Sequence, residues 1–241
     1  RRDVTVAIPE LLGTDWYVRT LIRRPDYPYD AAAGPAMFRN HLWLMPSGPV
    51  IKMSIHDADS VPPYRVINHP VEFRKDSLVA HIDPKNLPGD GTRGYLTRGD
   101  LFVLKMIADS SPQRPVYISR TTGSYGRALG FGPYLVGQGL VRKLSMAPVR
   151  TGRDTIAIQG FGFEDVARSD SLWQNYRAPD SVLRRGQWVD SASVGLPYDY
   201  AFTGQLLAAG LMAQGDTTRA RAVMNRVGAI VVAAGLVSGQ R

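Results

Sequence analysis

Apolar and polar residues alternate at the start of the chain, in the stretch DVTVAI over residues 3–8. Alternation with a period of two predicts a strand with one buried face. After a turn over 9–13, Thr14 precedes apolar residues at helical spacing, and Pro25 follows the basic end of that segment. Because threonine commonly caps helices and proline ends them, we expect a helix between these two residues. A strand followed by a helix is typical of an α/β layer.

The following stretch, residues 25–99, is rich in proline, glycine and asparagine and predicts a loop-rich insertion. Long ordered loops usually serve a partner, a ligand or a lid. Largely apolar spacing predicts a helix over 100–108, and we expect a helix and a strand within 134–146. Short apolar runs predict further strands over 50–55, 71–73, 78–82 and 116–119.

The end of the chain has the pattern of a helical hairpin. Alanine-rich windows over 200–214 and 217–232 flank Gln214-Gly215-Asp216, where glycine can close one helix and aspartate can cap the next. The spacing of small and large residues is similar to that of one tetratricopeptide unit. One such unit cannot bury its own face, so we expect it to pack on the α/β part or on a partner.

Together these patterns predict an α/β fold with a small mixed or parallel sheet, flanking helices, the loop-rich insertion and the C-terminal hairpin. The expected core includes the strands over 3–8 and 116–119. We place the α/β domain at 1–196 and the hairpin at 197–241.

Composition limits the function classes. The absence of cysteine excludes disulfides, thiolate metal sites and cysteine nucleophiles. The formal charge of +8 comes from arginines scattered over the whole length, which favours a solvated basic surface, or contact with anionic lipid or an acidic partner, over a nucleic-acid partner. No apolar run reaches the roughly 18–20 residues of a spanning helix. The chain starts at Arg1 without methionine, so we expect a longer or processed product.

Candidate chemistry is sparse along the chain. The glycine-rich segment over 123–132 has neither the spacing nor the lysine of a phosphate loop, which favours a packed turn. Ser124 has no histidine after it in the chain to act as a hydrolase base. His56, Asp57 and Asp59 could hold a cation, but such a short pattern is more often a solvent-facing turn at a strand end. We therefore expect no catalytic residue, cofactor or metal.

A contact surface is the remaining candidate site. Aromatic, methionine and arginine side chains are enriched at interface centres. The proline-rich stretch carries several of them without regular periodicity, so either a partner or a self-packed lid would cover them. The candidate interface residues are Tyr27, Tyr29, Met37, Phe38, Trp43, Met45, Arg219, Arg221 and Arg226.

Several motifs resemble one bacterial family. They are DVTVAI, LLGTDWYVRTL, YDAAAGPAMFRN, QRPVYISRTTG with GPYLVGQGLVRKL, and QGDTTRARAVM. In this order they resemble the soluble C-terminal region of the family called domain of unknown function 2723, whose members are similar to protein O-mannosyltransferase-like membrane proteins. The resemblance implies a periplasmic position, peripheral to or tethered at the inner membrane. It also implies that any glycosyl transfer belongs to membrane helices absent from this chain, so no catalytic residue carries over.

Two functions fit this sequence. The chain is either a structural or interaction subunit on the periplasmic face of a bacterial membrane protein complex, of the photosynthetic or respiratory kind, or an accessory domain that binds an acceptor or carrier sugar for a membrane glycosyltransferase-like protein. The partner is then a membrane complex, or a transmembrane part of the chain's own precursor, with anionic lipid as a further contact. The missing active site favours the first function.

Overall fold

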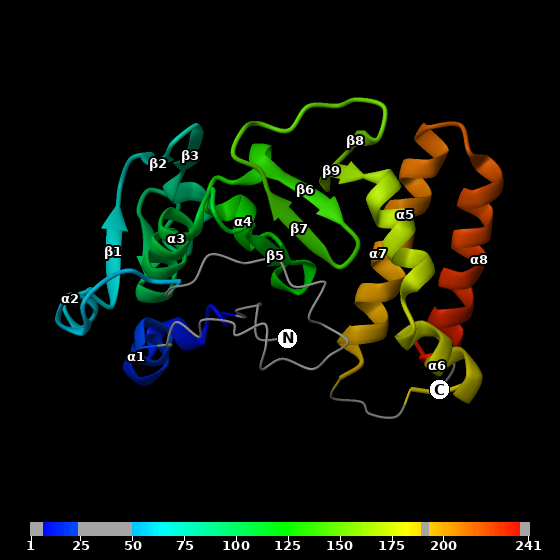
Figure 1. The fold of residues 1–241 in the computed structure, drawn as a ribbon, viewed down its shortest axis with the longest axis horizontal. Helices are drawn as coiled ribbons and strands as arrows, with labels where there is room; N and C mark the ends of the chain where they lie inside the picture. The colour runs from blue at the N-terminus through cyan, green and yellow to red at the C-terminus, as the bar shows by residue number, and fades with distance from the viewer. Residues whose placement is uncertain (1–6, 24–49, 189–192, 237–241) are drawn as a thin grey trace, which may run out of the picture. The chain divides into compact units, whose positions relative to one another are not determined.

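The computed structural model describes residues 7–23, 50–188 and 193–236, and its contacts divide the chain into two compact units (Figure 1). The N-terminal unit ends at Val116 and the C-terminal unit begins at Tyr117. Helices and small sheets occur in both units, so the α/β class is confirmed.

The N-terminal unit contains two antiparallel strand pairs, β1 with β4 and β2 with β3. Its elements are η1 (Leu11–Gly13), α1 (Asp15–Arg23), α2 (Ile55–Asp59), β1 (Tyr64–Ile67), β2 (Val71–Lys75), β3 (Leu78–Ile82), η3 (Pro84–Asn86), β4 (Gly94–Thr97) and α3 (Arg98–Ser110).

Helix α3 begins at a capping box, because the Thr97 side chain accepts from the backbone of Asp100 and the Asp100 carboxylate accepts from the backbone of Thr97. Its buried Phe102 belongs to the hydrophobic core that α3 shares with η1, α1 and α2. The core residues of this cluster are Leu12, Val18, Leu21, Val50, Ile51, Ala58 and Phe102.

Most predicted elements of this unit are confirmed, namely α1, α3, β2 and β3. The strand expected over 50–55 is wrong, because Ser54 caps α2 and turns the chain into a helix at Ile55. The strand expected over 3–8 lies mostly outside the described residues. Its last residue, Ile8, is in no strand and is 44% exposed, since its carbonyl accepts the hydrogen bonds that open η1.

The C-terminal unit combines one five-stranded sheet with helices. Its elements are β5 (Tyr117–Ser119), η4 (Arg120–Thr122), α4 (Tyr125–Ala128), η5 (Gly132–Tyr134), β6 (Leu135–Gln138), β7 (Val141–Leu144), β8 (Thr155–Ile158), β9 (Gly162–Asp165), α5 (Val166–Asn175), α6 (Ala178–Arg185), α7 (Gly195–Ala213) and α8 (Thr217–Ala233).

The sheet has the order β5-β7-β6-β9-β8 and is mixed, because β6 and β9 run parallel and the other neighbours are antiparallel. The predicted strand near 116–119 is confirmed as β5 at one edge. The helix expected within 134–146 is wrong, because β6 and β7 form a hairpin there. Burial alternates along both strands, and Gly139 at the turn adopts a φ of 62°, which favours glycine.

The predicted C-terminal hairpin is confirmed as α7 and α8, which lie side by side beside α5 (Figure 1). Gly215, with a φ of 84°, closes the C-terminal end of α7, and the Asp216 side chain caps the N-terminus of α8. The hairpin packs on α5, β8 and β9, in the same compact unit as the sheet. The sequence places a boundary at 196, whereas the contacts divide the chain after Val116.

A buried ion pair lies between the sheet and α5. Arg120 Nη2 donates to Glu164 Oε2 at 2.5 Å, and both side chains are 2% exposed. The other Glu164 oxygen accepts from Ser169 Oγ at 2.6 Å, and Ser169 in turn accepts from the backbone N–H of Gly139. Arg120 also donates to the carbonyl of Gly139. The pair is therefore surrounded by the additional hydrogen bonds that a buried charge pair requires.

Gly137 of β6 leaves the space that this pair occupies. A Cβ atom at this position would lie 2.0 Å from Glu164 Oε2 and 2.3 Å from Arg120 Nη2. Neither group could move away without losing its partner in the buried network. The requirement here is for the missing side chain, not for an unusual backbone angle.

We predict that Gly137→Ala lowers the free energy of unfolding by about 3–5 kcal/mol, the cost of breaking a buried pair. Urea denaturation of the full chain measures this change. Gly152→Ala is the matched control, because a Cβ there has no neighbour within 4 Å, and its effect should stay within about 0.5 kcal/mol. Equal effects of the two substitutions would contradict the prediction.

Candidate functional site

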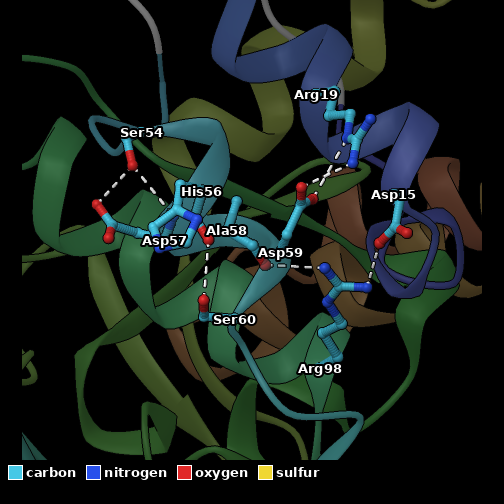
Figure 2. A network of polar contacts seen from close by, with 9 residues as sticks. All are labelled: Asp15, Arg19, Ser54, His56, Asp57, Ala58, Asp59, Ser60 and Arg98. Carbon is cyan, nitrogen blue, oxygen red and sulfur yellow. Dashed lines mark hydrogen bonds and ion pairs between the residues drawn. The ribbon is translucent and has the colours of Figure 1, made fainter.

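The cation site considered at His56, Asp57 and Asp59 is a short helix, α2, and not a turn at a strand end. Ser54 Oγ accepts from the Asp57 N–H at 3.0 Å and donates to the Asp57 carboxylate at 2.7 Å. The carboxylate of Asp59 pairs with Arg19 of α1 at 2.7 Å (Figure 2). Both aspartates are therefore engaged with protein groups.

Arg98 completes this network and connects three helices. Its guanidinium contacts the Asp15 carboxylate and donates to the carbonyl of Ala58 at 2.8 Å (Figure 2). It also lies over the Phe102 ring. Among the described residues, no group of three or more acidic or histidine side chains is arranged to hold a metal ion. The network around α2 thus ties α1, α2 and α3 together, which is a structural task.

We predict that Asp57→Asn combined with Asp59→Asn lowers the free energy of unfolding by less than about 1 kcal/mol, because exposed ion pairs contribute little. Millimolar Mg²⁺ or Ca²⁺ should leave the Tm of both proteins unchanged, since a ligand of the native state alone would raise it. Thermal denaturation measures both effects. A Tm increase in the original chain that disappears in the variant would establish a cation site.

The predicted interface residues differ in where they lie and in what they contact. Six of them, from Tyr27 to Met45, lie outside the described residues, whereas the three arginines lie on α8. Arg226 is an internal contact, because it pairs with Asp180 at 2.6 Å and lies over the Trp173 ring. It also donates to the carbonyls of Trp173 and Tyr176, so it fastens α8 to α5 and α6.

The other two arginines of α8 differ from each other. Arg219 pairs with Asp170 of α5, although it remains half exposed. Arg221 is exposed, and no side-chain bond is found for it within the described part of the chain. Of the three candidates, Arg221 is therefore the one that the fold leaves available to another molecule.

Arg221 belongs to an outer face of α8 that points away from the buried positions of the helix. Buried residues recur at Ala220, Val223, Val227 and Ile230. By helical spacing the opposite side carries the exposed residues Arg221, Ala222, Asn225, Gly228, Ala229 and Val232, and we call this set the α8 outer face. It contains no acidic residue, and Val232 is 70% exposed.

We predict that Arg226→Gln lowers the free energy of unfolding by about 1–3 kcal/mol, because it removes charged hydrogen bonds between α8 and its neighbours. Arg221→Gln is the control and should change stability by less than about 0.5 kcal/mol. Urea denaturation distinguishes the two. A stable Arg226→Gln chain would return this residue to the candidate interface.

A groove in the C-terminal unit brings together residues that lie far apart in the sequence. It has a volume of about 630 Å³ and is lined by the start of α7, the β5–α4 segment, β7 and the β8–β9 connection. The glycine-rich segment considered as a phosphate loop forms part of its wall. The lining residues used below are Arg120, Arg127, Arg142, Phe161, Tyr198, Asp199 and Phe202.

One side of the groove is basic and another is aromatic. Arg127 Nη1 donates to the carbonyl of Gly160 at 2.7 Å, and Arg142 Nη1 donates to the carbonyl of Gly123 at 2.8 Å. The aromatic side chains form a connected set. Edge contact joins Phe161 to Phe202 with ring centroids 5.4 Å apart, and Tyr198 stacks on Phe202 with centroids 6.4 Å apart.

Burial changes the electrostatics of this groove. Loss of water lowers the pKa of Arg142, and the nearby positive charges of Arg120 and Arg127 lower it further. Burial likewise raises the pKa of Asp199, so its carboxylate is protonated more readily than usual. Sequence patterning missed Arg142, although a charged residue on the buried face of the β7 alternation is the signal that could have found it.

No protein-family model, curated protein or solved structure matches this chain. No helix among the described residues has the length and hydropathy needed to cross a membrane. Two surfaces of the described residues are candidates for binding, the α8 outer face and the groove lined by arginine and aromatic side chains.

Proposed function

We propose that this chain is a non-catalytic extracytoplasmic domain that acts as an interaction or structural subunit on the periplasmic face of a bacterial membrane protein complex. The α8 outer face is the observation that carries this proposal. It is exposed, lacks acidic residues and combines Arg221 with the apolar Val232. Arginine is enriched at interface centres, whereas acidic residues are depleted there.

The occupant that fits this face is an acidic surface of a membrane protein. The chain carries a formal charge of +8, and residues 217–241 contain arginines without any aspartate or glutamate. Opposite charge speeds encounter and fixes orientation between partners. The tetratricopeptide likeness of the hairpin agrees with this role, since such units bind by contact. The family resemblance supports a location at the inner membrane, with a respiratory or photosynthetic complex, or the chain's own membrane-spanning part, as the partner.

The alternative is an accessory domain that binds an acceptor or carrier sugar for a membrane glycosyltransferase-like protein. The observation that favours it is the aromatic side of the groove, where Phe161 and Tyr198 are 44% and 59% exposed. Aromatic rings offer an apolar face on which a sugar ring can stack. This function uses a different surface from the docking proposal, so the two can be tested separately.

We predict that Arg221→Glu combined with Val232→Asp abolishes co-purification of the tagged full chain with a stoichiometric membrane protein partner in mild detergent. Both substitutions place negative charge on the α8 outer face, which would repel an acidic partner. Because both positions are exposed, the Tm should stay close to that of the original chain.

Arg65→Glu with Val66→Asp is the matched control. It makes the same chemical changes at exposed positions of β1 in the N-terminal unit and should leave the complex intact. Retention of the partner by the α8 variant would refute docking through this face. Retention of a polyprenyl-linked sugar, with no protein partner, would support the alternative instead.

A further inference from the structure

The charges that line the groove do not balance. Arg120 is neutralised by Glu164, to which it is bonded in the buried pair. Arg127 and Arg142 donate to carbonyl oxygens, which carry no net charge, and neither forms an ion pair within the described part of the chain. Two guanidinium charges without an ion-pair partner therefore face the groove, Glu164 acts on Arg142 only as its weakest electrostatic neighbour, and Asp199 is the one acidic residue among the lining residues.

Arg142 is the more unusual of the two because it is only 8% exposed. A buried charge without a counter-ion is unfavourable, and proteins normally pair it. The other arginines with largely buried side chains follow that rule, since Arg98 contacts Asp15 and Arg226 contacts Asp180. Arg142 therefore has the environment of a residue whose counter-ion comes from another molecule.

The start of α7 adds positive potential to the same groove. Gly195 and Leu196, its first residues, line the groove, and no acidic residue lies in the first turn. The N-cap residue, Val194, has no side chain that can accept a hydrogen bond from the helix. The N–H of Leu196 donates to the carbonyl of Ser193 and Pro197 has no N–H, so this terminus attracts an anion mainly through the helix dipole.

The aromatic side of the groove indicates what the anion is attached to. Phe161, Tyr198 and Phe202 form one connected set of rings, and two of them are largely exposed. Rings of this kind bury flat apolar surface well. A volume of about 630 Å³ is within the range of small-molecule sites.

We infer that this groove binds a small phosphate monoester whose uncharged part has a flat face. Arg127 and Arg142 hold the phosphate beside the start of α7, and the aromatic rings of the groove cover the flat face. A phosphate monoester carries close to two negative charges at neutral pH and so matches two guanidinium groups without a carboxylate partner better than a carboxylate does. This site is distinct from the α8 outer face, so it stands or falls independently of the docking proposal.

Calorimetric titration of the full chain with phenyl phosphate, inorganic phosphate and phenol tests this inference in a phosphate-free buffer of low ionic strength. Phenyl phosphate should bind at least about tenfold more tightly than either fragment, because it alone satisfies both sides of the groove; a tenfold change corresponds to about 1.4 kcal/mol. Arg142→Gln and Arg127→Gln should each weaken its binding by about tenfold or more.

Two further variants separate binding from folding. Asp199→Asn removes a negative charge from the groove and should tighten the binding of phenyl phosphate, a gain that damaged folding cannot produce. Arg150→Gln removes an exposed positive charge outside the groove and should leave affinity unchanged. If phenol binds as tightly as phenyl phosphate, if no probe binds, or if Arg150→Gln weakens binding as much as Arg127→Gln, the inference is wrong.

Discussion

The C-terminal unit depends on the buried pair between Arg120 and Glu164. Two opposite charges have been removed from water at the centre of the sheet, and Coulomb attraction alone rarely repays that cost. Hydrogen bonds of Ser169 and of the Gly139 backbone offset this desolvation cost, and they link β9, α5 and the β6–β7 turn. Arg120 is also the first residue of η4 and one of the lining residues of the groove, so the buried pair holds this part of the groove wall in place.

This arrangement explains why three arginines in one groove behave differently. Glu164 forms its ion pair with Arg120, so its negative charge only partly stabilises the charged form of Arg142. Arg142 sits on the buried face of β7, where the sheet holds its backbone in place. The fold thus compensates one guanidinium internally and leaves positive potential where the groove opens. A structural ion pair and a binding surface share the same region of the sheet without sharing a counter-ion.

Local patterns predicted the elements whose signals are local. Largely apolar spacing predicted α3, a short apolar run predicted β3, and the Gly215-Asp216 connection predicted the α7–α8 hairpin. The hairpin of β6 and β7 was missed because Gly137 and Gly139 weaken a short alternating pattern. The pair of Arg120 with Glu164 could not be foreseen, since it joins residues 44 positions apart that only the sheet brings together. The groove has the same origin, because its arginines and its aromatic residues come from separate elements.

Each compact unit is formed by one continuous stretch of chain, with the division after Val116. A ribosome therefore adds every residue of the N-terminal unit before the first residue of the C-terminal sheet. The first unit can complete its helices and hairpins during synthesis, whereas β6 must wait for β9, which the ribosome adds later. The parallel pairing of β6 with β9 makes the C-terminal sheet the later part of the nascent chain to close, and its exposed strand edges the part most in need of protection by chaperones until then.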